Sequence, residues 1–158
     1  MTPEQRLKDL GIALPAAHEG IGNYAPWSRS GNLIMTSGQF PWSGDELAYR
    51  GQLGGELSEE DGYQSARLSA LHAIAQLQNA AGGDLSRIRK IVRLEGHLFC
   101  REGFSHHAQV IDGASDMFNA IFPDLGKHSR AVHGCLAMPL NTTTLLYVYA
   151  EIDEESRS

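Results

Sequence analysis

The strongest helix pattern in the chain ends at two glycines and spans residues 58–83, which read SEEDGYQSARLSALHAIAQLQNAAGG. Ser58 is a favourable N-cap, and Asp61 stands three residues later, in the position that completes a capping box. Apolar side chains then recur at helical spacing as one stripe, formed by Tyr63, Ala66, Ala70, Ile74 and Leu77 and widened by Leu68, Leu71 and Ala75. Because Gly82 and Gly83 end this pattern, we predict a core-facing helix over residues 59–81.

Strand patterns and shorter helices lie on both sides of this helix. On its C-terminal side we predict a strand over 88–100, a helix from Ser105 or His106 to about Phe122, and strands over 130–138 and 142–152 joined by a turn at 139–141. On its N-terminal side we predict a helix over 2–10, two strands within 19–38 that meet at Ser30-Gly31-Asn32, and a glycine-rich loop over 39–57 with one short strand. This order indicates an α+β fold in which two helices cover one face of a mixed sheet.

The last predicted strand carries apolar or aromatic side chains on both of its faces. Its central part, Thr144–Ala150, reads TLLYVYA and has almost no polar side. A strand of this composition is typically buried on both faces, whereas the two helices of one chain cover one face of the sheet. We therefore expect the other face to meet another copy of the chain.

Length and composition indicate one domain without a membrane or nucleic-acid partner. The 158 residues suit a single domain over 1–158, with a short N-terminal helix, a core over 18–152 and a tail over 153–158 that frays. The net charge of -6 and the lack of a Lys/Arg run disfavour nucleic-acid binding. Because the N-terminus lacks a signal-peptide pattern and no run approaches about 18 apolar residues, we expect a cytoplasmic protein. Cys100 and Cys135 are expected to be reduced thiols rather than a disulfide.

No motif in the sequence indicates a metal or a cofactor. His106 and His107 are adjacent at a helix start, and neighbours on a helix point about 100° apart, which makes them poor joint ligands. The glycines of Gly20-Ile21-Gly22 precede a strand pattern instead of a helix, so a dinucleotide-binding interpretation fails. We predict neither a metal site nor a cofactor.

Arg130 is the residue that most suggests a binding role. It follows the loop Gly126-Lys127-His128-Ser129 and opens a strand pattern, and its guanidinium can hold a carboxylate through two parallel hydrogen bonds. His128 and His133 flank it, and either is placed to tune it. The alternative is that Arg130 forms a surface or intersubunit ion pair.

Four segments, in order and in register, resemble the RidA/YjgF reactive-intermediate deaminase family, whose members often carry the label endoribonuclease L-PSP. They are Gly22-Asn23-Tyr24-Ala25, Ser37-Gly38-Gln39-Phe40-Pro41, Asp112-Gly113-Ala114-Ser115-Asp116 and Arg130 through Pro139. The third is similar to a segment of a longer subgroup within the family. The resemblance covers residues 18–152 and implies a chorismate-mutase-like fold and a homotrimer, in which three sheets form a central barrel with the helices outside.

The resemblance also implies an activity and the residues that perform it. Members hydrolyse enamines and imines, such as 2-aminoacrylate, to keto acids and ammonia in clefts between subunits. By position, Arg130 would grip the ligand carboxylate, and the backbone carbonyl of Val132 would hold the attacking water. The other residues expected to line the cleft are Tyr24, Ser37, Gly38 and Ala131, the last in place of the usual hydroxyl residue. Tyr147 stands where many members carry a water-activating glutamate, and a phenol is a poor base at neutral pH because its pKa is ~10.

Two functions therefore stay open from the sequence. One is an imine hydrolase that uses Arg130 and an ordered water, and the other is a non-catalytic homotrimeric binder of 2-keto acids or related carboxylates. A third, endoribonuclease, rests on the family label, and the acidic composition opposes it.

Overall fold

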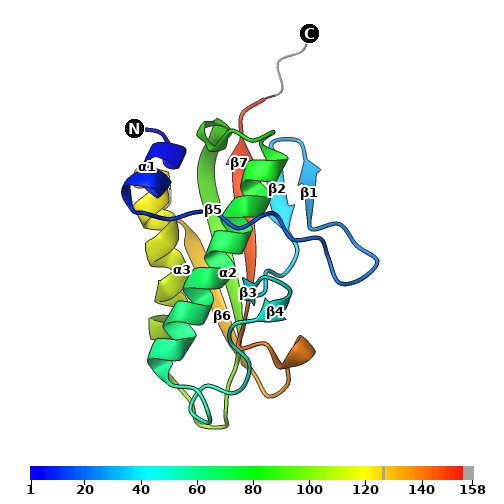
Figure 1. The fold of residues 1–158 in the computed structure, drawn as a ribbon, viewed down its shortest axis with the longest axis vertical. Helices are drawn as coiled ribbons and strands as arrows, with labels where there is room; N and C mark the ends of the chain where they lie inside the picture. Colours follow the sequence, from blue (N-terminus) through cyan, green and yellow to red (C-terminus); the bar gives the residue numbers. More distant parts are fainter. Residues whose placement is uncertain (126, 155–158) are drawn as a thin grey trace.

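The computed structural model, which describes residues 1–125 and 127–154, shows a five-stranded sheet with two long helices on one face (Figure 1). The helices are α1 (Pro3–Asp9), α2 (Glu59–Ala80) and α3 (His107–Ile121). The sheet strands are β1 (Trp27–Ser30), β2 (Leu33–Thr36), β5 (Ile88–Phe99), β6 (Ser129–Cys135) and β7 (Thr144–Ile152). The remaining elements are a small hairpin of β3 (Trp42–Ser43) and β4 (Glu46–Leu47), and two 3₁₀ turns, η1 (Leu85–Arg87) and η2 (Pro139–Asn141). This architecture confirms the predicted α+β plan.

The order of strands across the sheet places β6 at one edge. That order is β1-β2-β7-β5-β6. β5 and β6 are parallel, with α3 as the crossover between them, whereas the other neighbouring pairs are antiparallel. The outer side of β6 therefore has no strand partner within the described residues. In this register Leu94 of β5 lies opposite Arg130 of β6 on one side and Val148 of β7 on the other.

The helices α2 and α3 pack side by side and bury the core against the sheet (Figure 1). α2 begins as the sequence predicts, since the Ser58 hydroxyl accepts from the Asp61 backbone N–H and the Asp61 carboxylate accepts from that of Ser58. The two helices are in close contact at Gly113, where a Cβ atom would overlap the carbonyl oxygen of Tyr63. This approach is open to glycine alone, and it fixes the position of α3 against α2.

The opposite face of the sheet carries polar and aromatic side chains. Glu95 of β5 is paired with Tyr147 of β7, and both side chains are half-buried. The His97 ring lies beside them, with its centroid 5.1 Å from that of Tyr147 and 5.8 Å from that of His133 on β6. Half-buried aromatic groups of this kind support the expectation that a second copy covers this face, which stays a prediction.

The prediction that residues 19–26 belong to a strand is wrong. Strand β1 begins at Trp27, and residues 19–26 form no strand. Pro26 has no N–H to donate to a sheet, and the Tyr24 ring folds back over the preceding glycines. A Cβ atom would lie 2.8 Å from this ring at Gly20 and 3.0 Å at Gly22. The glycines therefore make room for a side chain instead of a strand.

The ends of the later elements also differ from the prediction. The strand predicted over 130–138 ends at Cys135, because the chain turns there. The turn leads into η2, in which Leu140 and Asn141 have positive φ angles. At the C-terminus, Asp153 accepts a hydrogen bond from Arg87 Nε at 2.9 Å, and its backbone N–H donates to the Arg87 carbonyl. Gly126 and the tail from 155 to 158 lie outside the described residues.

Candidate functional site

A cavity of about 430 Å³ lies beside the strand β7, on the side of the sheet away from the helices. The residues that line it are Ile21, Tyr24, Ser37, Gly38, Phe40, Pro139, Leu145 and Tyr147. Four predicted site residues, Tyr24, Ser37, Gly38 and Tyr147, thus come together from segments far apart in the sequence. Among the described residues, the lining includes no acidic, basic or imidazole side chain, so its walls are apolar apart from hydroxyl and backbone groups.

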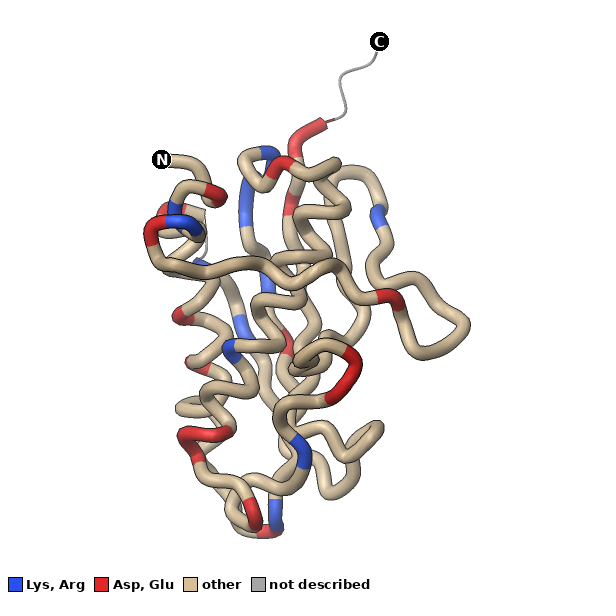
Figure 2. Tube along the Cα trace, in the orientation of Figure 1, with Lys and Arg blue, Asp and Glu red and all other residues tan. Residues whose placement is uncertain are grey.

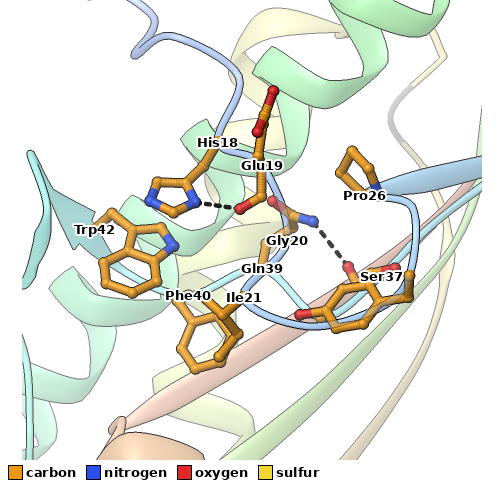
Figure 3. Close-up of a pocket in the computed structure, with 11 residues that line it drawn as sticks. His18, Glu19, Gly20, Ile21, Pro26, Ser37, Gln39, Phe40 and Trp42 are labelled. Carbon is orange, nitrogen blue, oxygen red and sulfur yellow. Dashed lines mark hydrogen bonds between the residues drawn. The ribbon is translucent and has the colours of Figure 1, made fainter.

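A smaller hollow adjoins this cavity (Figure 3) and shares five lining residues with it: Ile21, Tyr24, Ser37, Gly38 and Phe40. There the His18 ring stacks on Trp42 with centroids 4.4 Å apart. The Gln39 side-chain amide donates to the Ser37 carbonyl oxygen at 2.9 Å. These contacts hold the walls of the smaller hollow in place.

Ser37 and Gly38 are placed by the turn that follows β2. The Ser37 hydroxyl donates to the Ala25 carbonyl at 2.7 Å, and its N–H donates to the Pro26 carbonyl at 2.9 Å. Gly38 lies against the Tyr147 ring, since a Cβ atom there would be 3.1 Å from the phenol oxygen. A larger side chain at residue 38 would enter the space between Tyr147 and Leu145.

The Tyr147 phenol is a neutral hydrogen-bonding group in this site. Burial raises the pKa of the Tyr147 phenol above its ordinary value, and the neighbouring Glu95 carboxylate raises it further. At neutral pH the hydroxyl can donate or accept a hydrogen bond, but it cannot serve as the base that a glutamate would be.

Arg130 lies elsewhere, on the edge strand β6, and points to the helical layer. Its Nη1 donates to Asp112 Oδ1 at 2.6 Å and to Ser115 Oγ at 3.1 Å, both on α3. The ion pair that the sequence left open as an alternative is therefore present, within one chain. Arg130 does not line the cavity of Tyr24 and Tyr147, and β5 lies between β6 and β7.

The two residues after Arg130 present different groups to the surroundings. Ala131 is paired with Glu95, so it shares the open face of the sheet. The Val132 side chain packs against the core. Farther along β6, the Cys135 carbonyl points to β5, where it accepts a hydrogen bond from Cys100 N–H at 2.9 Å. Successive carbonyl groups of a strand point in alternate directions, and Val132 stands three residues before Cys135. The Val132 carbonyl therefore points the other way, to the free edge of β6.

The predicted site residues thus form two groups that one chain keeps apart. The cavity holds Tyr24, Ser37, Gly38 and Tyr147, whereas Arg130, Ala131 and Val132 lie at the edge strand. Their roles stay predictions. Sequence reasoning missed Leu145 in the cavity wall, although it stands two residues before Tyr147 and must share its strand face. It also missed the contacts of Asp112 and Ser115 with Arg130.

The adjacent histidines His106 and His107 have different partners. His106 Nδ1 lies 2.6 Å from a Glu59 carboxylate oxygen, whereas His107 Nε2 lies 3.8 Å from Cys100 Sγ. Both cysteines are free thiols, and burial raises the pKa of Cys100 to about 11. A thiol with this pKa is protonated at neutral pH, so it is a weak nucleophile.

Comparison with known proteins assigns the chain to a family. Residues 4–152 match the family described as "YjgF/chorismate mutase-like, putative endoribonuclease". Protein TCP17 of Trypanosoma cruzi is 33% identical over 148 residues, which cover 93% of this chain and 92% of that protein.

Two solved structures share the fold over nearly the whole length. A "putative endoribonuclease" from Shewanella oneidensis MR-1 is 45% identical, with a TM-score of 0.93 over 96% of this chain and all of that one. The protein Atu1372 from Agrobacterium tumefaciens, of unknown function, is 35% identical, with a TM-score of 0.89 over 96% of this chain and 94% of that one. Within residues 1–125 and 127–154, no helix is long and apolar enough to cross a membrane. The chain belongs to the YjgF/chorismate mutase-like family, also called the RidA/YjgF family.

Proposed function

We propose that the protein is a homotrimeric RidA-like enzyme that hydrolyses imines and enamines of amino-acid metabolism to keto acids and ammonia. Each site would combine the cavity of Tyr24 and Tyr147 in one copy with Arg130 of a neighbouring copy. The observation that carries this proposal is the separation of the two groups within one chain. In the part of the chain that the structure describes, no cation lines the cavity, and the arginine lies on a strand edge that another copy can approach.

The proposed chemistry needs orientation more than a strong base. The guanidinium of Arg130 would hold the substrate carboxylate, and the outward carbonyl of Val132 would accept a hydrogen bond from the attacking water. The water oxygen adds to the imine carbon while a proton passes to the imine nitrogen. The resulting carbinolamine releases ammonia and leaves the keto acid. Because the imine is intrinsically reactive, fixing it beside a water supplies a large part of the rate increase.

A second function is favoured by what lines the cavity. No carboxylate stands among its residues, and the raised pKa of Tyr147 keeps this group from acting as a base at neutral pH. The same composite cleft would then bind 2-keto acids or related carboxylates without turnover. Binding without imine hydrolysis would favour this function over the enzymatic one.

RNA cleavage, which the family description mentions, receives no support from the distribution of charge. Figure 2 shows Lys and Arg interspersed with Asp and Glu over the described part of the chain. With a net charge of -6, the protein repels a phosphate backbone.

The test is an imine-hydrolysis assay on wild type and Arg130→Ala side by side. Imines would be generated by an amino-acid oxidase from several amino acids, and their decay followed as loss of semicarbazone formation. We expect hydrolysis by the wild type and a loss of at least about 100-fold in Arg130→Ala, because the carboxylate loses a charge-assisted pair of hydrogen bonds. Equal rates in the two proteins would refute the role of Arg130, and inactivity of both would move the proposal to the binding function.

A further inference from the structure

The guanidinium of Arg130 is held from one side by α3. Both of its hydrogen bonds use Nη1, at 2.6 Å from Asp112 Oδ1 and 3.1 Å from Ser115 Oγ. Within the described residues, Nε and Nη2 of Arg130 donate no hydrogen bond. A carboxylate binds a guanidinium most strongly through two parallel hydrogen bonds. The side that remains, Nε with Nη2, is a complete fork for such a ligand.

The two groups that hold Nη1 stand on a rigid support. Asp112 and Ser115 are three residues apart, so they share one face of α3. Between them, Gly113 lies against the Tyr63 backbone of α2 and Ala114 is fully buried. This part of α3 therefore cannot shift along the sheet without breaking the contact between the helices.

Ser115 is itself fixed on a second side. It is 7% exposed, and its hydroxyl oxygen lies 2.8 Å from His128 Nε2 as well as 3.1 Å from Arg130 Nη1. His128 stands two residues before Arg130 and its ring packs edge-on to Phe118 of α3. The serine hydroxyl thus joins α3 to the segment that leads into β6.

We propose that Asp112 and Ser115 are positioning residues that orient the Arg130 guanidinium for the carboxylate of its ligand. This inference rests on the proposed function of Arg130 as the carboxylate-binding residue. A long, flexible arginine loses conformational entropy when it binds a ligand, and prior orientation by α3 removes much of that cost. The Asp112 carboxylate is 50% exposed, so solvent screens its opposing charge and the orienting effect dominates.

The experiment measures affinity for 2-oxobutanoate by titration calorimetry, with stability measured in parallel by thermal unfolding. The variants are Asp112→Ala and Ser115→Ala, each in the wild-type background and in an Arg130→Lys background. A lysine keeps the charge but cannot be held as a planar fork. Tyr63→Phe is the matched control. It removes a 2.7 Å hydrogen bond from Tyr63 on α2 to Asp116 on α3, and it leaves the hydrogen bonds of Arg130 in place.

We expect Asp112→Ala to weaken binding about tenfold and Ser115→Ala about threefold in the wild-type background. In the Arg130→Lys background each loss should shrink below about twofold, because both residues act through the guanidinium. Tyr63→Phe should lower the unfolding temperature and leave the affinity unchanged.

Three outcomes would overturn the inference. They are unchanged or tighter binding in Asp112→Ala, equal losses in both backgrounds, and a loss of affinity in Tyr63→Phe as large as that in Asp112→Ala. Failure of the proposed function looks different, since Arg130→Lys itself would then bind 2-oxobutanoate as tightly as the wild type.

Discussion

Among single residues, Tyr147 has the surroundings that bear most directly on chemistry. Its ring lies between the Gly38 backbone and the His97 ring, and its pKa is raised by burial and by Glu95. These neighbours hold the hydroxyl in the cavity and keep its proton in place. The residue can therefore order a water or a carbonyl oxygen by hydrogen bonding.

Replacing Tyr147 by Phe tests this role, because the ring stays while the hydroxyl is lost. We expect kcat/KM for imine hydrolysis to fall about tenfold, which corresponds to ~1.4 kcal/mol, the size of one hydrogen bond. The wild-type rate should stay level between about pH 7 and pH 9, because the raised pKa keeps the phenol neutral throughout. Asn119→Ala is the control, since Asn119 is exposed on α3 and does not line the cavity. A wild-type rate that climbs with pH and a flat one in the variant would instead identify the phenolate as a base.

At the scale of helices and strands, the pairing of α2 with α3 decides where Arg130 can point. The contact of Gly113 with the Tyr63 carbonyl leaves no space for a side chain. This contact sets the distance between α3 and β6, and it therefore determines whether the Asp112 carboxylate can contact Nη1 of Arg130. Each residue of the segment Asp112–Asp116 thus has its own contact. Asp112 forms the ion pair with Arg130, Gly113 contacts α2, and Ala114 is buried in the core. The Ser115 hydroxyl contacts His128, and Asp116 accepts the hydrogen bond from Tyr63.

The substitution Gly113→Ala should therefore destabilise the protein by about 3 kcal/mol, because the added methyl group forces the helices apart. Urea unfolding at one fixed protomer concentration would measure this, because any association between copies would add to the measured stability. Asn119→Ala is the control on the exposed side of α3 and should change stability by less than about 0.5 kcal/mol. If Gly113→Ala were as stable as wild type, the close approach of the helices would not be real.

Local patterns explain which elements the sequence predicts and which it does not. The capping residues Ser58 and Asp61 mark the start of α2 because a cap acts through its own helix. The prediction failed at 19–26, where the glycines serve the Tyr24 ring instead of a strand. The pairing of Arg130 with Asp112 is also beyond local patterns, because the α3 crossover joins residues 18 apart in sequence. The cavity residues were found through their resemblance to a family, and Leu145 needed the strand register.

In the molecule as a whole, one face of the sheet and the edge formed by β6 lack partners within the described chain. The face carries Glu95, His97 and Tyr147, and the edge carries Arg130. A ring of copies, each placing its edge beside the next copy's cavity, would complete both at once. Closed rings of this kind use two different surfaces on each copy.

Mixing two variants that we expect to be inactive tests the proposed sharing of the site between copies. Arg130→Ala lacks the cation, and Gly38→Leu fills the cavity between Tyr147 and Leu145. In trimers refolded together from equal amounts, about a quarter of the sites would pair an intact cavity with an intact arginine. We therefore expect about a quarter of the wild-type activity to return. Each variant alone, refolded in the same way and sized by mass photometry, is the control. No recovery from mixed trimers would place the whole site within one copy.

The free edge of β6 has one more consequence, which concerns its backbone. The Cys135 carbonyl faces β5, where it accepts from Cys100 N–H, so the alternation of a strand directs the amide hydrogens of 131 and 133 toward β5 and those of 130, 132 and 134 outward. In heavy water a lone copy would show alternately slow and fast deuterium uptake along these residues. Contact with a neighbouring copy would slow the fast set alone. The difference in deuterium uptake between the two sets of amides would therefore show, at each protein concentration, how long the β6 edge stays covered.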